Sequence, residues 1–294
     1  MLIEQVDGEQ QYSRADASNW TGSNESWNLV LEWLATCTSE HVECTVAKTP
    51  SWFPSRLIDV GNDARDFAKL VVTAHQPPTG HYVTLSHRWG SGKVFKLMHT
   101  TFEQLRSGIA VTELPLTFQH AIEIARRLKK QYIWIDSLCI YQDDDDRSDW
   151  LQEAALMYKV YANSFLNIAA TAAADGSEGL FVHWDPTAGL RPLEIICSTG
   201  VTSDGPTPSR TFLLQDILFL EREPMDAPLN RRAWVLQERL LFSRVLHFAA
   251  GQMFWECRKG VLCERFPQSL PESMSKMTSI TFKSFDIGCE VVWA

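Results

Sequence analysis

The chain lacks a long apolar run and an excess of positive charge. Its longest weakly polar stretch, Phe165 to Ala174, is too short and too rich in alanine to cross a bilayer. Residues 1–12 are acidic and have no apolar centre, so we expect no signal peptide there. Lys and Arg total 27 against 36 Asp and Glu, which gives a net charge of −9. An acidic chain has no field that attracts a phosphate backbone, and we expect no nucleic-acid or membrane partner.

The chain also lacks a disulfide framework and a glycine-rich phosphate loop. Its seven cysteines are an odd number without regular spacing, which favours reduced thiols in a cytosolic or nuclear protein, and we expect a cytoplasmic location. Gly90-Ser-Gly92-Lys93 is too short for a nucleotide loop and has no Ser or Thr after the lysine, which argues against an ordinary kinase, NTPase or dehydrogenase. What is present is a 45 % apolar fraction with 11 Trp, the composition of a globular protein with an aromatic core.

Three short apolar runs alternate with two amphipathic helices in the middle of the chain. The runs are residues 82–86, 132–135 and 165–169, and the helices are expected at 115–130 and 148–162. Strands and helices in this order predict right-handed crossovers and a parallel α/β sheet. An earlier helix is expected from Ser26 onward. Beyond residue 176 we expect a loop at 199–210, a helix at 230–241 and a hairpin at 245–256.

Several ordered blocks of the sequence resemble the fungal heterokaryon incompatibility (HET) domain. The first block is Tyr82-Val-Thr-Leu-Ser-His-Arg-Trp-Gly90. The second comprises Leu114-Pro-Leu-Thr-Phe-Gln-His-Ala-Ile122, Tyr132-Ile-Trp-Ile-Asp-Ser-Leu-Cys-Ile140, Gln142-Asp143, Asp149-Trp150 and Glu153-Ala154. The third comprises Arg232-Ala-Trp-Val-Leu-Gln-Glu-Arg239 and Phe254-Trp-Glu-Cys257. The resemblance implies a HET domain over residues 27–260, after a polar segment at 1–26 and before an irregular tail at 261–294.

HET domains are in turn remotely similar to TIR domains, some of which cleave NAD⁺ with a glutamate on a helix. This implies a TIR-like parallel sheet at about residues 80–175, flanked by helices, with an added α+β C-terminal segment. The TIR glutamate stands in a Ser-x-Trp-x-x-Glu pattern, and Ser148-Asp-Trp-Leu-Gln-Glu153 has that spacing. The resemblance makes Glu153 the candidate catalytic residue and NAD⁺ the candidate substrate, with no cofactor expected.

The helix itself places Glu153 at the rim of an apolar face. Glu153 lies about 60° around the helix from Trp150 and beside Met157. Partial burial at such a rim raises a carboxyl pKa, and a fixed carboxylate stabilises the oxocarbenium-like charge that develops when a nicotinamide–ribose bond breaks. The alternative is a surface glutamate that pairs with Arg147 or Lys159.

The residues after the first two strands are further candidates, because open α/β sheets bind ligands beyond the carboxyl ends of their strands. Arg88 suits a pyrophosphate and Trp89 suits stacking on a base, although Trp89 is equally expected as a core aromatic and Asp136 as a turn cap. The whole candidate substrate-binding set is Ser86, His87, Arg88, Trp89, Asp136, Ser137 and Trp150. Behind it, the supporting candidates are Arg232, Trp234 and Glu238, and for Arg232 a structural ion pair is favoured.

Two patterns have metal-binding residue types, and we expect no metal at either. Cys37-x₃-His41-x₂-Cys44 offers only three ligands and not the usual two-residue cysteine spacing, so a core cysteine pair with an incidental histidine is favoured. The acidic run at residues 143–146 suits Mg²⁺, but it is more often a solvated run that favours the start of a helix.

The leading interpretation is an incompatibility-type effector of non-self recognition and programmed cell death that hydrolyses NAD⁺ through Glu153. The rival interpretation is a non-enzymatic interaction or oligomerisation module that signals through partner proteins. In either case the expected partner is a second copy of the chain or another incompatibility protein.

Overall fold

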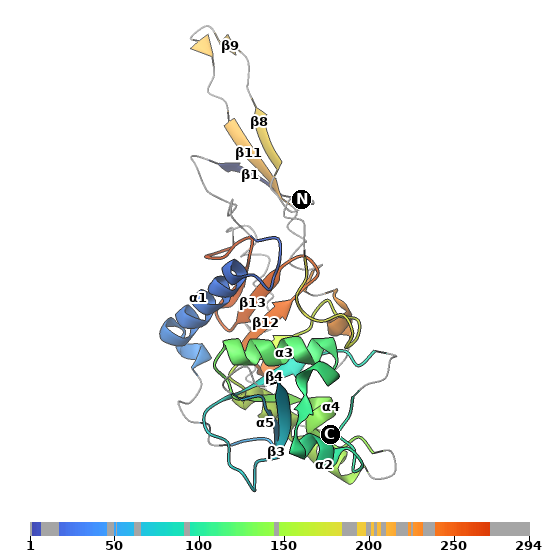
Figure 1. Ribbon diagram of the computed structural model, residues 1–294. Coiled ribbons are helices and arrows are strands. Elements are labelled where there is room, and N and C mark those ends of the chain that lie inside the picture. The colour runs from blue at the N-terminus through green and yellow to red at the C-terminus, as the bar shows by residue number, and fades with distance from the viewer. Residues whose placement is uncertain are drawn as a thin grey trace.

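A nine-stranded mixed sheet runs through the centre of the molecule, in the order β14-β13-β12-β7-β4-β6-β2-β3-β5 (Figure 1). The structure is a computed structural model that describes residues 2–6, 18–45, 50, 52–61, 66–90, 95–143, 147–183, 193–197, 201–202, 205–206, 210–215, 223–224, 226–231 and 239–270. The strands are β1 (Leu2–Val6), β2 (Arg56–Asp59), β3 (Phe67–Val72), β4 (Tyr82–Ser86), β5 (Ile109–Ala110), β6 (Tyr132–Ile135), β7 (Asn167–Ala169), β8 (Leu193–Cys197), β9 (Val201–Thr202), β10 (Gly205–Pro206), β11 (Arg210–Gln215), β12 (Arg244–Phe248), β13 (Met253–Cys257) and β14 (Gly260–Cys263). The helices are α1 (Asn24–Glu40), α2 (Phe102–Ser107), α3 (Leu116–Arg127), α4 (Asp136–Cys139) and α5 (Ser148–Asn163), with 3₁₀ turns η1 (Val42–Cys44), η2 (Val111–Glu113) and η3 (Pro228–Arg231).

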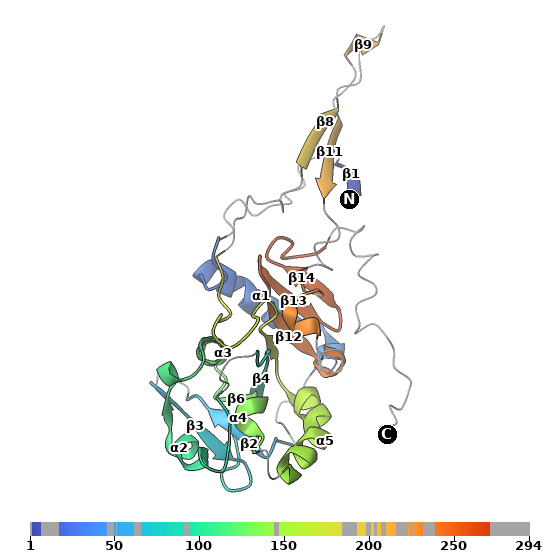
Figure 2. The ribbon, with the colours of Figure 1, turned by 90° about the vertical axis from the view of Figure 1, so that its right-hand side faces the viewer.

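The four central strands, β12, β7, β4 and β6, are mutually parallel. Every residue of β4, β6 and β7 is buried, as expected of strands covered by helices on both faces. In the sheet, β4 lies between β6 and β7. Helix α3 connects β4 to β6 on one side, and α5 then connects β6 to β7 on the other side of β4. Right-handed crossovers then place α3 and α5 on opposite faces of the sheet, as Figure 2 shows.

The elements expected in this region are confirmed. The first two apolar runs form β4 and β6 over their expected residues, and the third forms β7 from Asn167. α3 begins after Pro115, a residue whose fixed φ suits the start of a helix, and α5 begins at Ser148 as expected. The expected hairpin is the antiparallel pair β12–β13.

The core strands β4, β6 and β7 are parallel as expected, but they belong to a larger mixed sheet that also contains the strands of the added C-terminal segment. β12 joins the core beside β7, and β13 and β14 extend it in antiparallel order. On the other side β2, β3 and β5 continue from β6, again antiparallel. The physical reason is that β6 and β7 are buried, so their outer backbone groups need strand neighbours. Apolar runs identify buried strands but do not identify the strands that pair with them.

Helix α1 lies on the same face of the sheet as α3 (Figure 1). It begins at Asn24, two residues before the expected start, because the Ser23 side chain accepts a hydrogen bond of 3.0 Å from the Ser26 backbone N–H. Trp33 of α1 packs against Trp255 of β13, with ring centroids 6.5 Å apart. The helix that precedes β2 therefore packs on β13, a strand more than two hundred residues later in the sequence.

A three-stranded sheet of β1, β11 and β8 lies apart from the main sheet in both views (Figures 1 and 2). β1 therefore lies in the segment expected to be polar, and β14 extends to Cys263, into the expected irregular tail. The helix expected at 230–241 is seen at residues 239–241, whereas 232–238 and 271–294 lie outside the described residues. Among the helices of the described part, none has the length and apolar character needed to span a bilayer.

Candidate functional site

The carboxyl ends of β4 and β6 bring three sequence-predicted residues into contact. Leu85 and Ile135 are register partners, so His87 and Asp136, which follow these strands, lie side by side. The His87 Nδ1 atom is 3.7 Å from an Asp136 carboxylate oxygen. Trp89 donates its indole N–H to both oxygens of Asp136, at 3.2 and 3.1 Å. Asp136, the first residue of α4, also accepts the backbone N–H of Ser137 at 2.7 Å.

A cavity of about 860 Å³ opens beside this contact, between the loop after β4 and the start of α3. That volume lies within the roughly 300–1,000 Å³ of small-molecule sites. His87, Arg88 and Trp89 line one side, and Leu114 and Pro115 line another. The cavity lies beyond the carboxyl end of β4, where ligands bind in open α/β sheets.

Two cations and an indole set the chemistry of the cavity. The Lys96 Nζ atom lies 5.2 Å from the centre of the Trp89 ring. Arg88 is half-buried and has no hydrogen-bond or ion-pair partner within the part of the chain that the structure describes. Of the acidic lining residues, Glu113 is exposed and Asp175 is engaged by the Ser177 backbone N–H and hydroxyl, which lower the pKa of Asp175. This arrangement can accept a ligand with an anionic group and an aromatic ring.

Gly90, in the loop after β4 that lines the cavity, packs closely against the segment that follows β7. Its φ of +68° is a left-handed conformation that favours glycine, and a Cβ there would stand 2.3 Å from the Cβ of Asp175. The next residue, Gly176, accepts the Thr117 backbone N–H at 3.0 Å, which satisfies one of the free amides at the start of α3. The loops after β4 and β7 thus share a wall, although they are about eighty residues apart in the chain.

Besides Asp136, three other predicted binding residues are not among those that line this cavity. The Ser86 hydroxyl donates to the Asn167 side chain across the sheet at 3.3 Å, and Ser137 is fully buried in α4. Trp150 is half-buried on α5, where the Arg147 guanidinium lies 5.0 Å from its ring centre. These three residues support the edge of the sheet and the start of α5.

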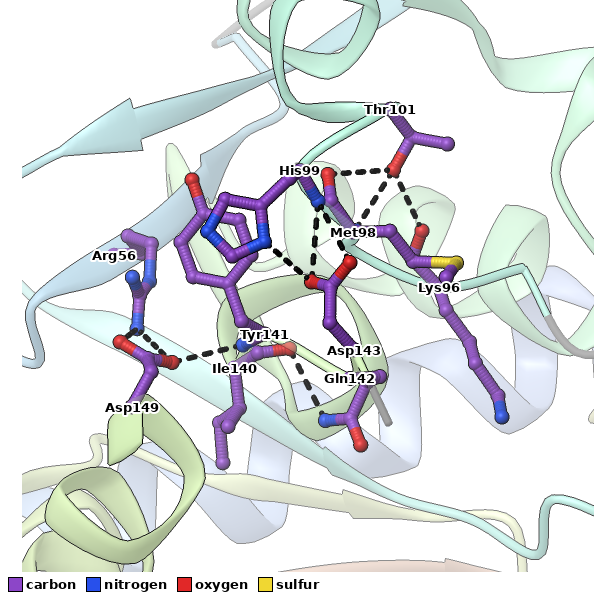
Figure 3. A network of polar contacts seen from close by, with 10 residues as sticks. All are labelled: Arg56, Lys96, Met98, His99, Thr101, Ile140, Tyr141, Gln142, Asp143 and Asp149. Carbon is purple, nitrogen blue, oxygen red and sulfur yellow. Dashed lines mark hydrogen bonds and ion pairs between the residues drawn. The ribbon is translucent and has the colours of Figure 1, made fainter. Parts of the chain in front are cut away.

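Glu153 is 3 % exposed and does not line the cavity. Its carboxylate is 3.6 Å from the Arg56 guanidinium. The Arg56 Nη2 atom also donates to both carboxylate oxygens of Asp149, at 2.7 and 2.8 Å (Figure 3). Arg56 further donates to the Cys139 carbonyl of α4 at 2.7 Å. Burial raises the pKa of Glu153, while a hydrogen bond from Ser55 and the charge of Arg56 oppose that shift. The contacts around Glu153 therefore form a joint between β2, α4 and α5.

The acidic run before α5 contributes one anchored carboxylate. Asp143 accepts the His99 backbone N–H, and its carboxylate is 2.9 Å from the His99 ring nitrogen (Figure 3). The His99 ring stacks on Tyr141 with centroids 4.6 Å apart. Asp143 thus fastens the loop that carries Lys96 to the loop before α5. The remaining residues of the run, 144–146, lie outside the described part.

The three supporting candidates, Arg232, Trp234 and Glu238, also lie outside the described residues. The next residue, Arg239, belongs to a buried polar network that the sequence analysis missed. Arg239 donates to Glu256 at 2.7 Å, and Glu256 is 2.9 Å from the His247 ring, whose other nitrogen lies 3.1 Å from the Thr171 hydroxyl. In the sequence, this network could have been inferred from His247 and Glu256, which are polar residues within the mainly apolar strands β12 and β13.

The structure adds a fourth residue to the Cys37–His41–Cys44 pattern, for which the sequence predicted a core cysteine pair and no metal. Cys257 joins Cys37, His41 and Cys44, and the ligand atoms of the four side chains all lie within 4.8 Å of one another. The fourth residue is more than two hundred positions from the other three, so local spacing did not reveal it.

A comparison with protein families matches residues 82–238, just over half of the chain, to the family described as heterokaryon incompatibility protein (HET). Among curated proteins and among solved structures no significant match was found. The matched range begins at β4 and contains the His87–Arg88–Trp89 loop, α3, β6 and α5.

Proposed function

The chain belongs to the heterokaryon incompatibility (HET) family, and from this premise we propose that it is an effector of fungal non-self recognition whose output is programmed cell death. It acts in the cytoplasm and signals through a second copy of itself or another incompatibility protein. The observation that carries the proposal is the match over residues 82–238, which covers the elements that build the cavity.

The cavity supports a ligand-dependent step in this signalling. Arg88 and Lys96 supply positive charge and Trp89 supplies a ring face, so the ligand class that fits is a nucleotide-like anion such as NAD⁺. The indole is held by Asp136, which keeps its ring in place before a ligand arrives. Binding at this edge touches the loops after β4 and β7 together, and these loops form the surface from which a partner is engaged.

The environment of Glu153 favours the interaction module over hydrolysis of NAD⁺. A catalytic carboxylate must reach the reacting atoms, whereas Glu153 is buried beside Arg56 and lies outside the cavity lining. Hydrolysis stays the second candidate because burial raises the pKa of Glu153, as it does for many catalytic carboxyl groups. The two mechanisms differ in what they require of Arg88 and of Glu153.

A killing assay separates them. Wild type, Arg88→Ala with Lys96→Ala, and Glu153→Gln are expressed at matched levels in a fungal host, and viable cells are counted. We expect the cavity double variant to lose killing and Glu153→Gln to retain it. Arg106→Ala is the matched control, because Arg106 is an exposed arginine of α2 paired with Glu103. Full killing by the double variant would remove the cavity from the mechanism.

The enzymatic candidate is tested directly with purified protein at high concentration and with a crowding agent. Nicotinamide release from NAD⁺ is measured for wild type and Glu153→Gln, and NAD⁺ binding is measured by calorimetry for wild type and Arg88→Ala. We expect binding that weakens in Arg88→Ala, without release. Release that disappears in Glu153→Gln would instead establish hydrolysis and place its site at α5.

A further inference from the structure

The strongest unassigned cluster consists of three thiols and one imidazole at the junction of α1 and β13. Cys37 lies in the last turns of α1, His41 is its C-cap residue, Cys44 ends η1 and Cys257 ends β13. The three cysteines are buried free thiols and His41 is half-buried. Three cysteines and one histidine form one of the ligand sets that bind Zn²⁺ tetrahedrally in structural sites.

The spacing of the ligand atoms agrees with such a site. With Zn–S bonds of about 2.3 Å, tetrahedral geometry separates two sulfur atoms by roughly 3.8 Å. All four ligand atoms already lie within 4.8 Å of one another, and the Cys257 Sγ atom is 3.5 Å from the His41 ring nitrogen. A contraction of at most about 1 Å per pair therefore closes the tetrahedron, which side-chain rotation alone can provide.

Arg244 provides an independent observation that points to a negatively charged group here. The side chain is 2 % exposed, and its guanidinium donates to the Phe165 and Cys44 carbonyls and to the Cys37 sulfur. Within the described ranges no carboxylate lies at ion-pair distance from it. A buried guanidinium without an anion is costly. Zn²⁺ with three thiolates and a neutral imidazole carries one net negative charge, and this balances Arg244.

Backbone donors also lie beside two of the sulfur atoms. The N–H groups of Arg258 and Lys259, in the turn after β13, hydrogen-bond the sulfur atoms of Cys44 and Cys257. Donors of this kind hold sulfur ligands in position in metal sites.

We propose that Cys37, His41, Cys44 and Cys257 bind one Zn²⁺ in a structural site that fastens α1 and η1 to β13. Four protein ligands complete the tetrahedron and leave no open position for a substrate, so the role is structural rather than catalytic. Cys37, His41 and Cys44 precede the family match at residues 82–238, and Cys257 follows it. The site therefore links the segment before the matched range to the segment after it.

The test measures metal in the full chain, purified under reducing conditions without chelators. We expect one zinc per chain in wild type, and loss of most of it in Cys257→Ser and Cys44→Ser. Cys263→Ser is the matched control, because Cys263 is a buried free thiol on β14 outside the cluster, and it should retain full zinc. Equal zinc in Cys257→Ser and wild type would overturn the proposal.

Cobalt keeps the proposal testable if the serine variants fail to fold. Wild type stripped of metal and titrated with Co²⁺ should show thiolate-to-metal charge transfer and the visible bands of tetrahedral cobalt. Cys257→His retains four ligands with one sulfur fewer, so its charge-transfer band should weaken while the tetrahedral bands remain. Wild type that binds neither metal under reducing conditions, or that joins two of the three thiols in a disulfide, would contradict a zinc site.

Discussion

At the residue scale, Gly90 shows how one backbone conformation shapes the cavity. Alanine at this position meets both the left-handed φ and the side chain of Asp175. We expect Gly90→Ala to lower the free energy of unfolding by about 1–3 kcal/mol in urea denaturation. Gly80→Ala is the matched control, because Gly80 has a φ of +81° but open space around its Cβ position. Equal losses in the two variants would mean that the Asp175 contact does not restrict the loop.

Glu223 gives a residue-scale prediction about pH. Burial raises the pKa of Glu223 from 4.5 to about 7, so the folded protein binds a proton there that the unfolded chain has already released. The stabilisation from this proton is full below pH 4.5 and is lost as the pH rises through 7. Glutamine does not titrate, so Glu223→Gln keeps a constant stability at this position while wild type loses stability as the pH rises. The free energy of unfolding of Glu223→Gln minus that of wild type should therefore increase between pH 5 and 8, on the order of 1 kcal/mol.

The matched control for Glu223 is Glu43→Gln, because Glu43 is exposed and its ion pair with Lys259 lowers its pKa. Urea denaturation at several pH values between 5 and 8 measures both variants. A flat difference between Glu223→Gln and wild type across that range would show that Glu223 is ionised in the folded protein at pH 5.

The sheet rule placed the residues after β4 correctly, whereas Asp136 and Ser137, which follow β6, do not line the cavity. Residues that depend on a returning loop were not predicted. His87, Arg88 and Trp89 come straight after β4, so the sheet rule placed them at the cavity. Lys96 reaches the same cavity only because its loop is fastened by His99 and Asp143. Cys257 reaches the α1 cysteines only through the pairing of β12 and β13 beside β7. No local pattern contains these tertiary contacts.

At the scale of elements, Arg56 joins β2 to α4 and α5. Arg56→Met would leave Asp149 and Glu153 as carboxylates without their cation, and we expect a loss of about 3 kcal/mol in the free energy of unfolding. Arg106→Met is the control, because its exposed pair with Glu103 on α2 should contribute less than about 0.5 kcal/mol.

A second substitution tests the same ion pair by removing one of the two carboxylates that Arg56→Met leaves without a cation. Adding Glu153→Gln to Arg56→Met should recover part of the loss, because one buried charge is then absent. If Arg56→Met proves as stable as the Arg106 control, the joint between β2 and α5 does not depend on this ion pair. Such a result would also leave Glu153 open to a role outside the joint.

The types and positions of the central elements were predictable because their periodicity is strong, whereas sheet membership was not. Helix α3 carries an apolar stripe, and β6 is an uninterrupted apolar run between polar segments. β2 and β3 lie among prolines and short polar stretches, and only their pairing with β6 makes them part of the sheet. The separation of β12 from its neighbour β7 by about eighty residues likewise has no local signature.

At the scale of the whole molecule, the family match is smaller than the unit that folds. A fragment of residues 82–238 keeps β4 between β6 and β7, but it removes β2 from beside β6 and β12 from beside β7. The buried outer backbone groups of β6 and β7 would then be exposed or unpaired. The fragment also loses α1 and the four residues of the Cys37–Cys257 cluster.

We therefore expect the 82–238 fragment to lack a cooperative unfolding transition by circular dichroism in urea, whereas residues 18–270, which retain every strand of the main sheet, should unfold cooperatively. The comparison is informative because both fragments contain the cavity-lining residues Arg88, Trp89 and Lys96. A cooperative transition in the shorter fragment would mean that three parallel strands and their two crossover helices form a stable core alone. The antiparallel strands on both sides would then be additions to that core rather than parts of the folding unit.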